Sequence, residues 1–475
     1  MPRSAAVLLA VLTATLGFTM PVRAQDWEPF LKQATGTLQE YLRIDTTNPP
    51  GDVTQAAAFF IEILRREGIN HEVFISDQAI GKLNLLAKLK GSGQARPILL
   101  LNHMDVVPVE RDQWDVEPFG GELRDGFIWG RGALDMKGMG LAGLMALIRL
   151  KQEGVQLSRD VLWLAVCDEE TGGGLGAKWL TRNYYDQLNP EFVLDEGGGI
   201  SQGLLTGDGR IVIAPSVNEK QVVWLTVTAR GRGGHGSMPH SENAVEILQQ
   251  ALGRLMAARA ELEQAAGDTV VEEMRQALGE LADTPYANAI SKNTITLTSF
   301  QAGVGDPPKV NVIPSEATAT LDCRLLPGVP VPAFLERLKA ALGDERVAVQ
   351  VTYQPAEPAT GSPSDTAFFY ALTQTAREFY PDAVVVPQLL PGATDARFFR
   401  AKGAIAYGFQ PVLLGAEDWA MIHGHNERIA VEQFHRMIRI FYEILKRVAQ
   451  APTQAGSPQR GIGAPHSAGI SLPGS

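Results

Sequence analysis

Apolar and polar positions recur with two different periods along the first part of the chain. Mostly apolar runs such as 97–101 and 160–167 are typical of buried strands, whereas 138–153 repeats its apolar residues at helical spacing. Helices and strands that alternate in this way predict an α/β fold, with a central sheet covered by helices. The helices expected in this part are 27–43, 55–67, 138–153 and 176–183, and the strands are 72–76, 84–90, 97–101, 160–167 and 192–194.

The pattern changes near Asn218, where strands with one apolar and one polar face begin. The order strand, helix, strand, strand, helix, strand is ferredoxin-like, so we predict that 218–355 forms a separate α+β domain inserted into the first. An extra helix at 269–281 is expected to lengthen this domain. The strands expected here are 221–229, 293–300, 317–325 and 347–353, and the helices run from 243 through the 250s and from 331 to 342.

The α/β pattern returns after the insertion, with helices expected at 364–380 and 431–448. The first domain is therefore predicted to consist of 25–217 and 356–450. Residues 451–475 are rich in Pro, Gly, Ser, Ala and Gln and have almost no large apolar side chain, which predicts a disordered tail.

The N-terminal residues have the features of a secretory signal peptide at 1–24. Arg3 supplies the positive start, 5–18 is mostly apolar, and Ala24 is the small residue that cleavage needs. This apolar core is too short to span a bilayer. We therefore expect an exported protein, periplasmic or secreted, with no stable membrane insertion.

The net charge of the chain bears on which class of partner it could bind. The 475 residues carry a formal net charge of -11 at pH 7 without any basic cluster, which argues against a nucleic-acid partner and leaves small polar substrates open. Cys167 and Cys323 lie in separate apolar, strand-like runs, so buried thiols are expected rather than a disulfide.

A histidine and an aspartate follow the apolar run 99–101, where a buried strand should end. In open α/β sheets, functional residues gather at the carboxyl ends of the strands. Alternate residues of a strand share a face, so Asp105 could hold the ring of a metal-bound His103 from behind. Taken alone, the pair also fits a local hydrogen-bonded cap.

Four further clusters of histidine and carboxylate residues lie at the ends of predicted strands or helices. Each has a structural alternative: Asp135 could cap the next helix, and the acidic run 168–170 could be a solvated loop. Three successive acids after a buried strand repel one another unless a cation neutralises them. Together the clusters match a binuclear zinc centre, in which imidazoles and carboxylates bind and one aspartate bridges two ions. They are Asp135; Asp168, Glu169 and Glu170; Asp195 and Glu196; and His423 and His425.

These segments, in this order, resemble the aminoacylase, carboxypeptidase and desuccinylase family of two-zinc peptidases. The forms Val-Leu-Asp-Glu-Gly-Gly at 193–198 and Ile-His-Gly-His-Asn-Glu at 422–427 are most similar to the carboxypeptidase S type, which includes secreted N-acyl amino acid hydrolases. The resemblance covers nearly all of 26–450. It implies a zinc-exopeptidase-like catalytic domain with a mixed central sheet flanked by helices, and an inserted ferredoxin-like lid that mediates dimerisation.

The resemblance also implies a role for each residue of the centre. Glu169 is the general base and Asp105 orients a histidine ligand. Among the ligands, Glu196 is favoured over Asp195, which remains the alternative, and the motif spacing selects His423 rather than His425. The implied ligands are His103 on one zinc, Asp135 bridging both, Glu170 on the other zinc, Glu196 and His423.

Further residues are implied to contact the substrate. His235, in the loop 231–239, matches the histidine that stabilises the oxyanion, often across the dimer interface; a surface histidine is the alternative. Asn311 and Arg324 match substrate-binding residues of the lid, and Arg324 lies on the polar face of its predicted strand, where it would suit a substrate carboxylate. The loop 392–397 resembles a glycine-rich substrate loop. Its candidate residues are Gly392 and Asp395, and a helix N-cap at Thr394 or Asp395 is the alternative.

The sequence therefore predicts a zinc hydrolase that cleaves the amide of an N-acyl amino acid or a short peptide with a free carboxylate. The family mechanism implies attack by a metal-bound hydroxide, with Glu169 as general base and two Zn²⁺ per chain, for which Co²⁺ or Mn²⁺ could substitute. A dipeptidase or another small-amide deacylase is the nearest alternative, and a non-catalytic exported binding protein is the alternative from another class. The expected partners are the small-molecule substrate and a second copy of the chain.

Overall fold

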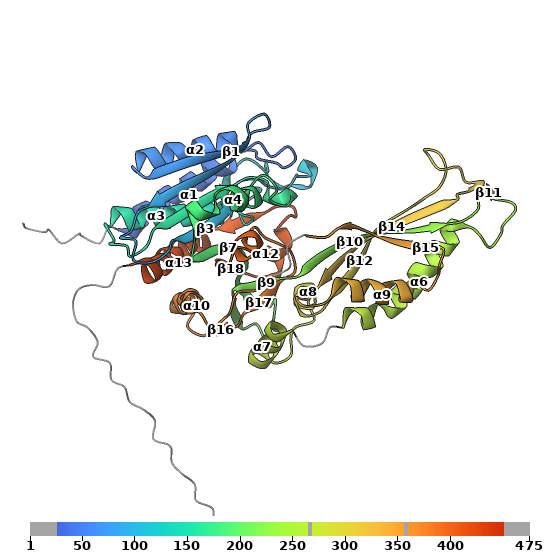
Figure 1. Ribbon diagram of the computed structural model, residues 1–475. Coiled ribbons are helices and arrows are strands. Elements are labelled where there is room, and N and C mark those ends of the chain that lie inside the picture. The colour runs from blue at the N-terminus through green and yellow to red at the C-terminus, as the bar shows by residue number, and fades with distance from the viewer. Residues whose placement is uncertain (1–25, 265–267, 356–359, 451–475) are drawn as a thin grey trace, which may run out of the picture.

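The computed structural model describes residues 26–264, 268–355 and 360–450, which form two β-sheet units arranged side by side in an elongated molecule (Figure 1). The predicted signal peptide at 1–24 and the predicted tail at 451–475 lie outside these residues and remain predictions. The larger unit, here called the main domain, contains a ten-stranded sheet. The smaller unit, here called the lid, contains a four-stranded sheet.

The sheet of the main domain is mixed, as the resemblance implies. Its strands are β1 (Asn70–Asp77), β2 (Lys82–Leu89), β3 (Ile98–His103), β6 (Val161–Val166), β7 (Phe192–Gln202), β8 (Ile211–Ala214), β9 (Ser216–Glu219), β16 (Val384–Val385), β17 (Gln388–Leu390) and β18 (Ile405–Leu414). They are arranged in the order β1-β2-β6-β3-β7-β18-β9-β17, and β8 pairs with β7 and β16. The central strands β6, β3, β7 and β18 run parallel, so their carboxyl ends lie along one edge.

Helices cover both faces of this sheet. One face carries α1 (Trp27–Leu42), α2 (Thr54–Arg66), α3 (Lys137–Gln152), α10 (Ala367–Phe379) and α13 (Val431–Ala449), and the other carries α4 (Ala177–Asn183), α5 (Tyr185–Leu188) and α11 (Ala396–Arg400). Ile98 and Leu100 of β3 pack into the first core, and Leu99 and Leu101 pack into the second. Burial on both faces explains why this strand is a continuous apolar run.

Shorter elements complete the main domain. A three-stranded antiparallel sheet pairs segments from distant parts of the chain, with β19 beside β5 and β5 beside β4. These elements are η1 (Arg111–Gln113), β4 (Glu122–Arg124), β5 (Phe127–Trp129), η2 (Glu169–Thr171), α12 (Ala416–Met421) and β19 (Arg428–Ala430).

The lid has the ferredoxin-like arrangement predicted for this part of the chain. Its elements are β10 (Gln221–Arg230), α6 (Ala244–Glu263), β12 (Thr294–Ala302), β14 (Glu316–Leu325), α9 (Val331–Leu342) and β15 (Val347–Tyr353), with a short hairpin of β11 (Gly234–His235) and β13 (Val312–Ile313) at one end. The sheet order is β12-β14-β10-β15, and all pairs are antiparallel. Helices α6 and α9 cover one face, where alternate residues of β10 and β14 are buried (Figure 1).

The helical insert within the lid sequence packs mainly against the main domain. Helices α7 (Thr269–Leu278) and α8 (Pro285–Ser291) bury apolar residues against β8, β16 and β17. The extra helix expected at 269–281 thus begins where predicted and ends earlier, because Gly279 follows Leu278 with a positive φ of 80°. The domain limits predicted at residues 218 and 355 remain predictions.

The sheet contains more strand than the sequence analysis predicted. The short strands β8, β9, β16 and β17 were not predicted. The strand expected at 192–194 continues to Gln202, because β18 pairs with β7 as far as Ser201. Asp195 and Glu196 therefore lie inside a strand and not after its end. The long strand β18 was not predicted, although most of it is buried, because a buried run without a polar period cannot be told from a buried helix by periodicity.

Both cysteines are buried and free, as expected. Within the described ranges, no helix combines the length and the apolar character that crossing a membrane requires.

Candidate metal centre and active site

Five segments that are far apart in the sequence meet at the carboxyl edge of the large sheet. His103 ends β3, the glutamate pair lies in η2, two residues after the end of β6, and Glu196 lies in β7. Asp135 precedes α3, and His423 follows α12. The sheet thus places every predicted metal ligand in one region, because parallel strands present their carboxyl ends together.

The first half of the cluster contains His103, Asp135 and Glu196. Nε2 of His103 lies 3.1 Å from Oδ1 of Asp135 and 3.6 Å from Oε1 of Glu196. On its other side, Nδ1 of His103 lies 2.9 Å from the main-chain oxygen of Asp105. A proton on Nδ1 that is donated to this carbonyl leaves Nε2 with its lone pair directed at the two carboxylates, as a metal ligand requires.

The second half contains His423, Asp135 and Glu170. Nε2 of His423 lies 3.1 Å from Oδ2 of Asp135 and 3.2 Å from Oε2 of Glu170. Asp135 therefore directs one oxygen at each histidine. This is the placement expected of a carboxylate that bridges two ions.

The cluster holds more negative charge than its burial tolerates without a cation. Burial, and then the neighbouring Asp135, raise the pKa of both Glu170 and Glu196. Burial, followed by the charge of Glu196, also raises the pKa of Glu169 well above its ordinary value. Oε1 of Glu170 has no hydrogen-bond partner among the described residues. A divalent cation would supply both the missing partner and the missing charge, so these residues fit a metal site.

Asp105 has a different set of contacts from the one the sequence suggested. Its carboxylate lies 3.7 Å from the ring of His103, whereas it accepts the main-chain N–H groups of Glu169 at 3.3 Å and Glu170 at 3.2 Å. It also accepts Nδ2 of Asn48 at 2.8 Å. The Asp105 side chain therefore holds the glutamate loop, and its main-chain oxygen contacts the histidine.

The two alternatives left open by the sequence occupy different positions. Asp195 accepts the main-chain N–H of Ala396 at 2.7 Å, and burial raises its pKa to about 6. Glu196, not Asp195, lies beside His103. His425 lies 3.6 Å from Glu110 on the surface, while His423 faces the carboxylate cluster.

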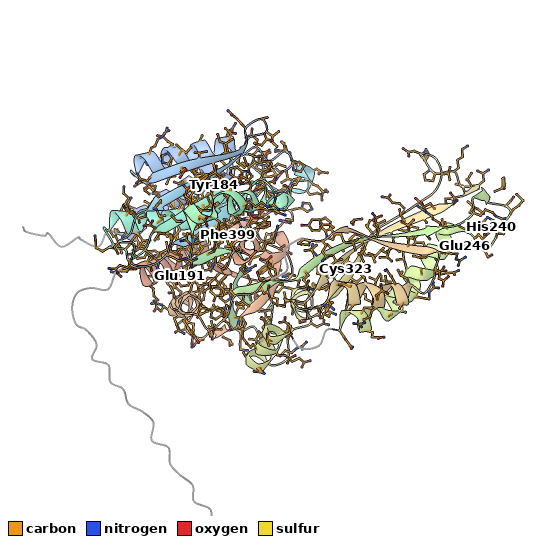
Figure 2. All side chains as sticks on the ribbon, viewed as in Figure 1. Tyr184, Glu191, His240, Glu246, Cys323 and Phe399 are labelled. Atoms are coloured by element: carbon orange, nitrogen blue, oxygen red, sulfur yellow. The ribbon has the colours of Figure 1, made fainter. Side chains whose placement is uncertain are left out.

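The predicted lid residues are not all brought to the cluster of their own chain. His235, in β11, and Asn311, beside β13, lie at the end of the lid remote from the main domain, where His240 also lies (Figures 1 and 2). Arg324 lies near the other end of β14 and forms a two-bonded ion pair with Asp322, at 2.7 and 3.0 Å. Two of its donors are thereby occupied.

The loop 392–395 packs beside the glutamate loop. Asp395 is buried, and neither of its oxygens has a hydrogen-bond partner among the described residues. Burial raises its pKa to about 8. A Cβ added to Gly173, in the glutamate loop, would lie 2.3 Å from Oδ1 of Asp395, so the two loops are in close contact. A Cβ added to Gly392 would have no atom within 4 Å. Neither Thr394 nor Asp395 caps α11 through its side chain.

One residue with a structural role here was not singled out from the sequence. Glu427 is fully buried and pairs with Arg131 at 2.6 Å. It also accepts the main-chain N–H groups of Gly132, Leu134 and Asp135 at 3.0, 2.7 and 3.0 Å. It thus links the His423 segment to the Asp135 loop. The sequence Asn426-Glu427, shortly after His423, could have indicated this role.

Known proteins resemble this chain along most of its length. The model of peptidase family M20/M25/M40 matches residues 99–447. The chain is 31% identical to the N-fatty-acyl-amino acid synthase/hydrolase PM20D1 of Xenopus tropicalis, over 93% of this chain and 92% of the relative. It is 30% identical to the probable carboxypeptidase S-like 2 of Dictyostelium discoideum, over 77% and 75%, and 30% identical to human aminoacylase-1, over 87% and 95%.

Solved structures share the fold at lower sequence identity. An M20 family metallo-carboxypeptidase, Sso-CP2 of Sulfolobus solfataricus, superimposes with a TM-score of 0.66 at 21% identity, covering 87% of this chain and 98% of the other. The YXEP protein of Bacillus subtilis, described as a dinuclear metal-binding peptidase, gives 0.57 at 15% identity, covering 89% and 99%. The resemblance seen in the sequence is confirmed: the chain belongs to peptidase family M20/M25/M40 and is an enzyme of the metallopeptidase and amidohydrolase type.

Proposed function

We propose that this enzyme hydrolyses the amide bond of N-acyl amino acids or short peptides that have a free carboxylate, with two zinc ions per chain. The relatives named as N-fatty-acyl-amino acid synthase/hydrolase and aminoacylase-1 support the acyl amino acid class. The observation that carries the proposal is the placement of one Asp135 oxygen at each of two histidines, within a cluster of buried carboxylates.

The residues divide into two candidate ligand sets. His103 and Glu196 would hold one ion, His423 and Glu170 the other, and Asp135 would bridge them. Imidazole and carboxylate groups are the ligands that zinc prefers at hydrolytic sites, although Co²⁺ or Mn²⁺ could substitute. Zinc bound there would lower the pKa of a water molecule and polarise the amide carbonyl.

Glu169 is the candidate general base. An oxygen of Glu169 lies within 4.8 Å of ligand atoms of both His103 and Glu196, so it borders the ligand cluster. It would take the proton of the attacking water and pass it to the amine nitrogen that leaves. The raised pKa of its buried carboxyl suits a group that must hold the proton between these two transfers.

Other residues would bind the substrate around this centre. Arg324 would contact the substrate carboxylate with the N–H groups that Asp322 leaves free, or after that ion pair opens. Gly392 and Asp395 would border the substrate in their loop. Asn311 and His235 lie far from the cluster of their own chain, so we propose that they serve the site of a partner subunit, in a homodimer formed through the lids.

A dipeptidase or another small-amide deacylase of the same family is the nearest alternative. The motifs do not encode the shape of the acyl and side-chain pockets, which sets this choice. We also propose export to the periplasm or the exterior, on the composition of the N-terminal residues.

A substrate panel tests the proposal. The zinc-loaded enzyme is assayed for release of free amino acid from N-acyl amino acids of increasing acyl length and from dipeptides, alongside Glu169→Gln. We expect hydrolysis of one of these classes, with zinc retained and turnover lost in the variant. Glu336→Gln, on the exposed surface of α9, is the matched control and should retain full activity. Turnover by Glu169→Gln near the wild-type rate would rule out its role as base.

A further inference from the structure

Two buried residues of opposite charge are adjacent where the chain passes from the main domain to the lid. Glu219 ends β9 and is 4% exposed, and Lys220, which precedes β10, is 2% exposed. Successive side chains of an extended segment point to opposite sides, so one contacts the main domain and the other contacts the base of the lid.

Glu219 is bonded to the loop 392–395. Its Oε1 accepts the hydroxyl of Thr394 at 2.8 Å, and its Oε2 accepts the main-chain N–H of Thr394 at 3.2 Å. Its carboxylate also pairs with the buried guanidinium of Arg400, in α11. The Thr394 hydroxyl is therefore used on the linker and not as a helix cap.

Lys220 is bonded to the segment that enters the lid. Its Nζ donates to the main-chain oxygens of Ala289 and Lys292, both at 2.7 Å, and to the hydroxyl of Thr294 at 3.2 Å. These acceptors lie at the end of α8 and the start of β12. Its own N–H donates to the oxygen of Leu390 at 3.0 Å, which adds a link to the main domain just before the loop 392–395.

The same loop is tied to the catalytic glutamates on its other side. Arg397 donates to the main-chain oxygen of Thr394 at 2.9 Å and to that of Gly172 at 3.2 Å. Gly172 directly follows η2, which contains Glu169. A continuous set of hydrogen bonds thus runs from the linker through Thr394 and Arg397 to the glutamate loop.

Stability alone does not account for a buried charge in the linker. Apolar residues of similar volume often replace a buried ion pair without loss of stability, because desolvation of the charges offsets their attraction. What Glu219 supplies, and an apolar side chain would not, is a fixed direction for two donors of Thr394. The carboxylate of Glu219 therefore fixes the position of Thr394 relative to the linker.

We propose that Glu219 is a positioning residue: from the linker to the lid it fixes Thr394, so that the loop 392–395 keeps one position relative to Glu169. The lid and the loop are then held by two adjacent residues of one short segment. The inference rests on the proposed function for its kinetic consequence, whereas its structural consequence can be measured separately.

Three threonine variants of the zinc-loaded full chain test this. Thr394→Val removes the hydroxyl bond to Glu219 and keeps the side-chain shape, and Thr394→Ser restores the hydroxyl. Thr373→Val is the matched control, because the buried hydroxyl of Thr373 donates within its own helix, to the main-chain oxygens of Phe369 and Tyr370. We expect kcat/KM to fall at least tenfold in Thr394→Val, to stay within threefold of wild type in Thr394→Ser, and to stay within twofold in Thr373→Val, with zinc content unchanged in all three.

Hydrogen exchange supplies a readout that does not depend on activity. Amides of 391–397 and of 169–173 should exchange faster in Thr394→Val than in wild type or in Thr373→Val. Equal kinetics in the two valine variants, or unchanged exchange in both segments, would overturn the inference. A wild-type enzyme that hydrolyses none of the panel would instead contradict the proposed function, and the exchange measurement would still decide whether the bond between Glu219 and the Thr394 hydroxyl positions the loop.

Discussion

Replacing Asp105 with asparagine separates two functions that one residue performs in the structure. The main-chain oxygen, which contacts Nδ1 of His103 at 2.9 Å, is unchanged by the substitution. The carboxylate, which accepts the N–H groups of Glu169 and Glu170, loses its charge and one of its two acceptor atoms. We therefore expect Asp105→Asn to bind metal normally and to catalyse poorly.

The magnitude follows from the number of donors on each oxygen. Among the residues that the structure describes, Oδ2 accepts both Nδ2 of Asn48 and the N–H of Glu170, whereas Oδ1 accepts only the N–H of Glu169. The asparagine should keep its oxygen at the Oδ2 position, because that retains two bonds, and should direct its NH₂ group at the N–H of Glu169. Loss of one hydrogen bond to a charged group costs about 1.5 to 3 kcal/mol. If the whole cost falls on the position of the base, kcat/KM drops about 10- to 150-fold.

The assay compares kcat/KM and metal content in wild type, Asp105→Asn and a control. Asp160→Asn is a suitable control, because the carboxylate of Asp160 also accepts a main-chain N–H, that of Gly91 at 2.8 Å, at the opposite end of β6. We expect this control to keep its activity and Asp105→Asn to keep its zinc. Loss of zinc in Asp105→Asn would refute the reasoning, because it would show that the carboxylate supports His103 itself.

Two further predictions concern residues at a distance from the base. Glu427→Gln should lower the free energy of unfolding by about 3 to 5 kcal/mol, because it leaves the buried Arg131 without its charged partner. Urea denaturation measures this change, and a loss below about 1 kcal/mol would contradict the role given to the ion pair. His235→Ala should lower kcat about 10²- to 10³-fold with zinc content unchanged, as removal of an oxyanion donor does. Mixing His235→Ala with Glu169→Gln should restore part of the activity if the histidine serves the partner's site, and no recovery would contradict that role.

The sequence predicted the strands whose pattern of apolar residues is typical of a strand alone. The alternating faces of 221–229 and 317–325 identified β10 and β14, and the run before His103 identified β3. The strand β18 escaped prediction, because it is buried along most of its length and so has no polar period. The extent of β7 escaped as well, since its pairing beyond residue 194 depends on β18 and β8, which come from later in the chain.

Most candidate ligands were accessible from the sequence because they lie next to an element end that the pattern locates; Glu196, inside β7, is the exception. The roles that depend on the direction of a side chain could not be predicted from the sequence. Whether Asp105 meets His103 through its side chain or its main chain is set by the turn after β3, and spacing along a strand does not encode this. The bonds of Glu219 and Glu427 to loops far away in the sequence were beyond prediction for the same reason.

The central claim is that Asp135 bridges two metal ions, and the metal content of the purified chain tests it most directly. Elemental analysis after dialysis against zinc should give about two ions per chain for wild type and for Glu169→Gln, and at most a small residual content for Asp135→Ala, because both candidate ligand sets share that carboxylate. A wild-type chain that holds no zinc, or an Asp135→Ala variant that still holds two ions, would contradict the account.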